Sequence, residues 1–384
     1  MPLAISADRL FTPEQEIPHP IVVISEGRIA AIGRRGEVAL PGGIERRDFP
    51  GAVLLPGLFD VHIHGGAGHD LMQPDAAGRE RFERHLFRQG VTAYLPTTMT
   101  APVEPTLRAL DHLAGAVEAA VEHHPSGRAR PLGIHMEGPF ISPAKPGVQP
   151  VEMMQPPSAP LFERFWEASR GRMRLITLAP ELSGAEALIA AAAARGVTVS
   201  LGHCDADYDS VQRAIAAGAR HVTHAFNAMR PLDHRAPGIV GAALGDDRLY
   251  AEIIADGLHL HPAVVRIFLR AKGVERAVLV TDAISATGQG DGRFRLGPIE
   301  VQVEGERCLY NGHLAGSVLA LDRAVRNVIE FAGLDLNLAW RLASFNPARM
   351  LNLPGERGRL VSGAPAELVA ATPAGHVLEV FGGS

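Results

Sequence analysis

The chain has 384 residues, of which 46% are hydrophobic, 21% charged and 5% aromatic, and its formal net charge is −5. This length allows one large domain together with a smaller one. The acidic balance, the absence of dense Lys/Arg runs and the few aromatic side chains argue against a nucleic-acid-binding surface. No apolar stretch approaches the roughly 20 residues that span a bilayer, and no signal peptide is evident. We therefore expect a cytoplasmic protein that binds neither nucleic acid nor membrane.

Short β-rich runs fill residues 1–56, where Glu26-Gly27 and Pro41-Gly-Gly43 supply turns between them. Residues 57–354 then alternate between strand-like and helix-like segments, such as the helical pattern over 185–195. Eight strands with crossover helices predict a closed (β/α)8 barrel of the TIM type rather than an open sheet. The expected strands span 58–64, 93–98, 132–137, 175–179, 198–203, 222–227, 251–255 and 277–282.

After the eighth strand, residues 292–308 read as an inserted hairpin, and residues 355–384 return to short β-rich runs separated by Gly and Pro. Because both chain ends lie outside the alternating region, we expect them to pair. The sequence thus predicts an α/β fold with two domains. Residues 1–56 with 355–384 would form a small β-sandwich, and residues 57–354 would form the barrel.

Four of the expected strands end in side chains that can bind a metal ion. His62 and His64 lie two residues apart, so both face the same side of the first strand. The third strand ends at Glu137, the fifth at His203 and the sixth at His224. Because the strands of such a barrel open on one face, these side chains should meet there.

Four imidazoles and one carboxylate are good ligands for zinc, with iron, manganese and cobalt as alternatives. These five side chains are more than a single catalytic zinc ion with three protein ligands needs. Two arrangements stay open: two ions share Glu137, or one ion uses Glu137, His203 and His224 while the pair on the first strand binds weakly.

Asp282 ends the last expected strand and is the candidate acid/base. Water bound to a divalent ion has a pKa near 7, which makes hydroxide available for attack at neutral pH. Asp282 would take a proton from that water and give it to the leaving group. Its alternative role is a helix N-cap. Cys204 and Cys308, far apart in sequence, predict no disulfide framework.

Longer motifs surround these residues, namely PGLFDVHIHG at 56–65, HMEGPFISP at 135–143, THAFNAM at 223–229, DGLH at 256–259 and LVTDA at 279–283. Together they resemble the N-acetylglucosamine-6-phosphate deacetylases of the amidohydrolase superfamily over almost the whole chain. The resemblance implies hydrolysis of the N-acetyl group of that amino-sugar phosphate to glucosamine-6-phosphate and acetate. It also implies a metal site at Glu137, His203 and His224, a second ion at the His62/His64 pair, and Asp282 as the catalytic acid/base.

The resemblance further implies roles in substrate binding. Arg235 matches an arginine that reaches the phosphate bound by a neighbouring subunit, which implies a homodimer. Asn227 and the Ala228 backbone match phosphate contacts. The other implied substrate-binding positions are His259, Leu314 and Ala315.

One segment departs from the family pattern. After the 135–143 motif the family carries a Lys-Gly-x-His segment, whose histidine contacts the sugar or acyl oxygen, whereas this chain reads Pro146-Gly-Val148-Gln149. Glutamine donates and accepts hydrogen bonds but cannot become cationic. Val148 and Gln149 are therefore candidates for an altered substrate contact, and N-acetylgalactosamine-6-phosphate or another acylated amino-sugar phosphate stays open as the substrate.

Two other functions stay open as more remote alternatives. A cyclic amidase of the dihydroorotase type would need a carboxylated lysine on the fourth strand, where this chain reads RLITLAPE over 174–181. A non-catalytic sugar-phosphate sensor would keep Asn227 and Arg235, but it would not need Asp282 or a full set of metal ligands. Bound metal separates the sensor from the enzyme.

Overall fold

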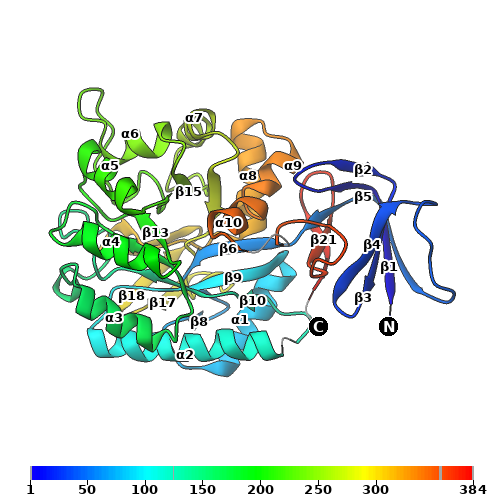
Figure 1. Cartoon of the computed structure of the whole chain (residues 1–384), viewed down its shortest axis with the longest axis horizontal. Coiled ribbons are helices and arrows are strands. Elements are labelled where there is room, and N and C mark those ends of the chain that lie inside the picture. Colours follow the sequence, from blue (N-terminus) through cyan, green and yellow to red (C-terminus); the bar gives the residue numbers. More distant parts are fainter. Residues whose placement is uncertain (1, 124, 354–356, 383–384) are drawn as a thin grey trace.

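The computed structural model describes residues 2–123, 125–353 and 357–382. A barrel of parallel strands wrapped by helices forms the larger part of the molecule, and a sheet made from the two chain ends lies beside it (Figure 1). This arrangement confirms the expected fold class.

Eight parallel strands form the barrel, and hydrogen bonds join each to its neighbours from β6 to β9, β11 and onward to β16. The ring closes where the chain beyond β16 meets β6: Asp282 N donates to His62 O at 2.9 Å, and His64 N donates to Ala283 O at 2.8 Å. The strands are β6 (Leu58–Ile63), β9 (Val91–Thr98), β11 (Ile134–Glu137), β12 (Met173–Leu178), β13 (Thr198–Leu201), β14 (His221–Val222), β15 (Tyr250–Ile254) and β16 (Ala277–Val280).

Three barrel strands end at least two residues before the residue that the sequence pattern predicts. β16 is one of them, because it stops at Val280 whereas a strand over 277–282 was expected. β13 stops at Leu201 and β14 at Val222, whereas strands over 198–203 and 222–227 were expected. Beyond these points the backbone turns into the left-handed region at His203 (φ 46°) and His224 (φ 25°), which ends a strand. Hydrophobic alternation carries no signal for that turn.

Helices cover the outside of the barrel between successive strands (Figure 1). α8 illustrates why they form, because its buried residues Leu321, Ala324, Val325 and Val328 recur at helical spacing and give one apolar face. The helices are α1 (Ala76–Arg88), α2 (Val103–Glu122), α3 (Ala159–Ala168), α4 (Ala185–Ala194), α5 (Tyr208–Ala217), α6 (Gly238–Gly245), α7 (Pro262–Lys272), α8 (Leu321–Ala332), α9 (Leu336–Arg341) and α10 (Phe345–Met350), with a 3-10 turn at Val151–Met153. Among the described residues, no helix is both long enough and apolar enough to cross a membrane.

The two chain ends pair in one seven-stranded sheet, in the order β22-β21-β5-β1-β3-β4 with β2 beside β1. Its inward side chains form a separate apolar core that includes Ile5, Val22, Leu54 and Leu368. The strands are β1 (Leu3–Phe11), β2 (Glu16–Pro18), β3 (Pro20–Ser25), β4 (Arg28–Arg34), β5 (Glu45–Pro56), β21 (Leu368–Ala371) and β22 (Val377–Phe381). The expected boundary at 354/355 lies outside the described residues, so the domain limits stay a prediction.

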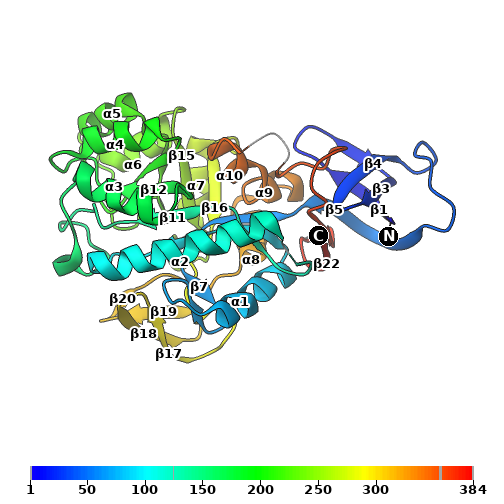
Figure 2. The same ribbon diagram turned by 60° about the horizontal axis from the view of Figure 1, so that its bottom comes forward.

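A small four-stranded antiparallel sheet replaces the expected hairpin over 292–308. It consists of β17 (Gly292–Leu296), β18 (Ile299–Glu304), β19 (Arg307–Tyr310) and β20 (His313–Leu314), and it lies near α1 at the lower edge of Figure 2. Two-residue strands at β7 (Gly65–Gly66) and β8 (His69–Asp70) form a turn after β6. The last of these strands, β20, matters because it brings Leu314 to the cavity at the barrel mouth.

Candidate metal centre and active site

Three of the predicted site residues follow their strands in the same way. His203, His224 and Asp282 each lie two residues beyond the last residue of β13, β14 and β16. All three have positive φ, at 46°, 25° and 50°. Such conformations cost about 1–3 kcal/mol each and concentrate at functional sites. The barrel therefore turns these side chains inward at its mouth instead of continuing the strands.

The first ligand group consists of Glu137, His203 and His224, and all three side chains are buried. The Nε2 atoms of His203 and His224 lie 3.1 Å apart, and they lie 3.3 and 3.2 Å from Glu137 Oε1. Two imidazole nitrogens and a carboxylate oxygen that converge on one point form a metal-binding arrangement.

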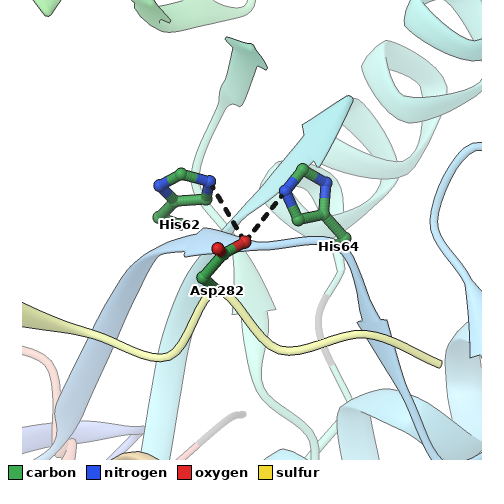
Figure 3. A group of neighbouring side chains, drawn as sticks. All are labelled: His62, His64 and Asp282. Atoms are coloured by element: carbon green, nitrogen blue, oxygen red, sulfur yellow. Dashed lines mark ion pairs between the residues drawn. The ribbon is translucent and has the colours of Figure 1, made fainter. Parts of the chain in front are cut away.

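The second ligand group consists of His62, His64 and Asp282 (Figure 3). Asp282 Oδ1 lies 3.2 Å from His64 Nε2 and 3.5 Å from His62 Nε2. Glu137 contacts this group as well, with Oε1 3.4 Å from His62 Nε2 and Oε2 3.3 Å from His64 Nε2. The carboxylate of Glu137 thus lies between the two groups.

The buried polar atoms at this centre fit a divalent metal ion. His62 Nε2 has no hydrogen-bond partner among the described residues, although it is fully buried. A buried nitrogen without a partner costs about 1–3 kcal/mol, and a bound cation would remove that cost. Imidazole and carboxylate are also the donors that divalent transition metals accept.

The electrostatics of the centre favour cations. Burial raises the pKa of Glu137, but His62, His203 and His224 outweigh it and hold that pKa well below its ordinary value. Burial likewise raises the pKa of Asp282, and the charges and hydrogen bonds of His62 and His64 outweigh it and lower that pKa. Both carboxylates are therefore ionised near neutral pH.

The pKa values of His62 and His64 are raised, whereas those of the two carboxylates are lowered. Burial opposes protonation of His64, but its contacts with Asp282 and Glu137 outweigh burial and raise its pKa to about 9. A metal ion at this position would displace protons and take over the positive charge.

A cavity opens at the barrel mouth, and residues of both ligand groups line it. Its polar floor includes His64, Glu137, His203, His224 and Asp282, and its other walls include Met99, Ile254 and Leu296. A cavity in which a few polar groups converge among apolar side chains is typical of a small-molecule site.

A family model described as the amidohydrolase family matches residues 53–381. The chain belongs to the amidohydrolase family. It is 36% identical to the N-acetylgalactosamine-6-phosphate deacetylase of Escherichia coli O157:H7 over 98% of this chain and 97% of that protein. It is 40% identical to the N-acetylglucosamine-6-phosphate deacetylase of Homo sapiens over 88% of this chain and 84% of that protein.

A solved structure of a Mycobacterium smegmatis N-acetyl-D-glucosamine-6-phosphate deacetylase variant, in complex with N-acetyl-D-glucosamine-6-phosphate, shares the fold. Its TM-score is 0.91 at 34% sequence identity, and the match covers 99% of this chain and 97% of that one. These comparisons confirm the resemblance that the sequence motifs indicated.

Several residues expected to bind substrate line the cavity of this amidohydrolase. They are Val148, Gln149, Asn227, Ala228, His259 and Leu314. His259 is held by Asp256, whose Oδ2 accepts from His259 Nδ1 at 2.7 Å. That bond leaves His259 Nε2 as the ring nitrogen available to a ligand. The substrate-binding roles themselves stay predictions.

Gln149 is more constrained than an ordinary substrate contact. Its Nε2 donates to Glu137 Oε2 at 2.8 Å, and its Oε1 accepts from Thr100 N at 2.8 Å. Both ends of the buried amide are therefore occupied, which fixes its orientation beside Glu137.

Two predicted residues lie away from the cavity of their own chain. Ala315 is fully buried and packs in an apolar cluster with Ile284 and Cys308. Arg235 is exposed on the loop between β14 and α6, where its backbone N donates to Asp233 Oδ1 at 2.8 Å. This position neither supplies nor excludes a contact with a second subunit.

The sequence pattern missed several residues of the site in this amidohydrolase. Met99 directly follows β9 and Ile254 ends β15, so the strand-end rule that predicted the candidate metal ligands could have found both residues. Leu296 belongs to β17, and no local pattern predicts how that inserted sheet docks. Glu252 and Asp256, which hold His62 and His259, are acids in or just after the buried strand β15, a signal that was available.

Proposed function

We propose that this amidohydrolase removes the N-acetyl group from N-acetylglucosamine-6-phosphate and releases glucosamine-6-phosphate and acetate. One observation carries the proposal: Glu137, His203 and His224 line one cavity together with His64 and Asp282. The deacetylases named among its relatives match nearly the whole chain, which supports the choice of substrate.

The ligand groups would hold one or two divalent ions, and we propose zinc, with iron, manganese or cobalt as alternatives. When bound, such an ion polarises a carbonyl oxygen and lowers the pKa of water. Glu137, His203 and His224 would hold one ion, and His62 with His64 would hold the second.

Asp282 is the residue placed to move the proton. Its lowered pKa keeps it ionised, so it can accept a proton from the attacking water. The oxygen of that water bonds to the acetyl carbon, the C–N bond breaks, and Asp282 returns the proton to the departing amine nitrogen. Because it lines the cavity, Asp282 is within reach of the bound amide.

Asn227, the Ala228 backbone and His259 would hold the sugar phosphate. The Asn227 side chain makes only long hydrogen bonds, at 3.4 Å to His224 O and Ala225 O, so its amide is free to turn toward a phosphate oxygen. Arg235 would reach the phosphate in a partner subunit of a homodimer, because arginine offers a planar fork of donors to phosphate oxygens. Two free buried cysteines, Cys204 and Cys308, support the proposed cytoplasmic location.

Other substrates and functions have less support. N-acetylgalactosamine-6-phosphate is not the favoured substrate. The human relative named for the glucosamine epimer is 40% identical to this chain, whereas the Escherichia coli relative named for the galactosamine epimer is 36% identical. A cyclic amidase with a carboxylated lysine is not supported, since β12 reads MRLITL and has no lysine. The full ligand set and Asp282 argue against a non-catalytic sensor.

The test is amine release by zinc-loaded protein from N-acetylglucosamine-6-phosphate, with the galactosamine epimer and unphosphorylated N-acetylglucosamine alongside. We expect fast turnover of the first and a far poorer reaction with the unphosphorylated sugar. Chelator-treated protein is the control and should be inactive. Preference for the galactosamine epimer would identify that epimer as the substrate instead, and the absence of amine release from every sugar would refute the proposal.

A further inference from the structure

A buried carboxylate of the barrel strand β15 lies beside His62. Glu252, on β15, has no exposed surface, and its Oε2 lies 2.9 Å from His62 Nδ1. The proposed reaction assigns no role to Glu252, and it does not line the cavity above the site.

The contact fixes which nitrogen of His62 can bind a ligand. Because a carboxylate oxygen accepts hydrogen bonds, the contact favours the His62 tautomer in which Nδ1 carries the hydrogen and donates it to Glu252. The lone pair of the neutral ring is then on Nε2, the atom that points to Asp282 and Glu137. Metal-binding histidines are commonly oriented in this way by a carboxylate behind them.

Glu252 also has few polar or charged partners for a buried acid. Among the described residues it forms no ion pair with Lys or Arg, and its Oε1 has no hydrogen-bond partner. The next polar neighbour, His221, lies 3.6 Å away and is itself bonded to Ser200 Oγ at 2.9 Å. A buried charge with so few partners is expensive unless a cation is near.

The other ligand histidines differ from His62. His64 and His224 have no partner for Nδ1 among the described residues, and His203 Nδ1 lies 3.3 Å from the backbone oxygen of Lys145. His62 is therefore the ligand histidine that a carboxylate orients. If His62 were only a packed core residue, a neutral partner such as a serine or a backbone carbonyl would satisfy its Nδ1 at lower cost.

We propose that Glu252 is the positioning residue of a second metal ion held by His62, His64 and Asp282. The chain would then bind two ions, and Glu252 would set the affinity of the second ion without touching it. The proposal rests on the proposed metal-dependent function, and it resolves the number of ions that the ligand set leaves open.

The experiment counts metal ions without using substrate. Wild-type protein and the Glu252→Gln variant are equilibrated at a series of buffered free zinc concentrations, and zinc per chain is measured together with the two dissociation constants. Glu83→Gln is the matched control, because Glu83 is also a buried carboxylate but lies on α1 beside Tyr94. Circular dichroism checks that each variant is folded.

We expect wild type and Glu83→Gln to bind two ions. Glu252→Gln should keep the tighter ion at its original affinity and bind the weaker one about 10- to 100-fold less tightly. If Glu252→Gln does not fold, Glu252→Asp replaces it, and its shorter side chain should weaken the same ion. One ion in wild type, or unchanged affinities in the folded Glu252 variant, would overturn the proposal. Two ions in a protein that releases no amine would refute the proposed function and leave this inference standing.

Discussion

Replacing Asp282 with asparagine should remove the proton acceptor and leave the backbone of the site in place. Asp282 has φ 50°, a left-handed conformation that asparagine adopts more readily than most residues. The substitution therefore adds little backbone strain. The asparagine amide keeps the size of the side chain but cannot accept a proton from water at neutral pH.

The expected loss follows from the acid/base role of Asp282. General acid–base catalysis contributes about 10²- to 10⁴-fold, which corresponds to roughly 2.7–5.5 kcal/mol of transition-state stabilisation. We expect kcat to fall by that factor. The ligand group of Glu137, His203 and His224 does not include Asp282, so an ion bound there should remain.

The assay is amine release under saturating substrate, paired with a zinc determination on the same sample. Asp207→Asn is the control, because Asp207 caps α5 by accepting from Ser210 N and asparagine caps a helix equally well. The control should keep wild-type kcat. An Asp282→Asn variant that retains zinc and loses less than about tenfold in kcat would refute the acid/base role.

Three further outcomes are expected. In metal-free protein the pKa of His64 is raised from 6.5 to about 9, so protonated His64 stabilises the fold fully below pH 6.5, and this stabilisation is lost as the pH rises through 9. The free energy of unfolding in urea should therefore be lower by up to roughly 3 kcal/mol at pH 9.5 than at pH 6.5. The His64→Gln variant should lose most of that difference. Arg235→Ala should raise KM for the phosphorylated sugar about 10- to 150-fold and leave the unphosphorylated sugar unaffected, as expected for one charge-assisted contact, and an unchanged KM would rule that contact out. Gly57→Ala should lower stability by about 1–3 kcal/mol in thermal unfolding, because its Cβ would lie 2.1 Å from Thr92 Oγ1, and adding Thr92→Ala should recover part of the loss.

Much of the site was predictable because, in a barrel of parallel strands, residues that follow successive strands lie side by side on one face. Once Glu137, His203 and His224 were placed at strand ends, the common face of parallel strands implied that they meet. The fold class followed from the same alternation. The turn that aims His203 and His224 inward was not predictable, since it depends on left-handed backbone at residues that are not glycine.

Other features depend on contacts between distant segments, which local patterns do not encode. β1 is a central strand of the small sheet, although Asp8 and Arg9 interrupt its apolar pattern. The docking of β17 beside the cavity, which places Leu296 there, depends on tertiary packing alone. Glu252 is a different case, because a single acid within the apolar pattern of a strand indicates a buried polar contact.

The junction between the two sheets has a consequence for how this chain can vary. Only Gly57 separates β5 from β6, Trp340 Nε1 donates to Pro56 O at 2.7 Å, and β21 pairs with β5 up to Pro56. The small sheet and the His62/His64 pair are thus parts of one continuous ribbon. The small sheet is consequently not an interchangeable module: a graft from a relative that changed the ribbon length by one residue would rotate both histidines out of the site. Length variation among relatives should therefore gather in distant turns, such as residues 35–44, and spare this junction.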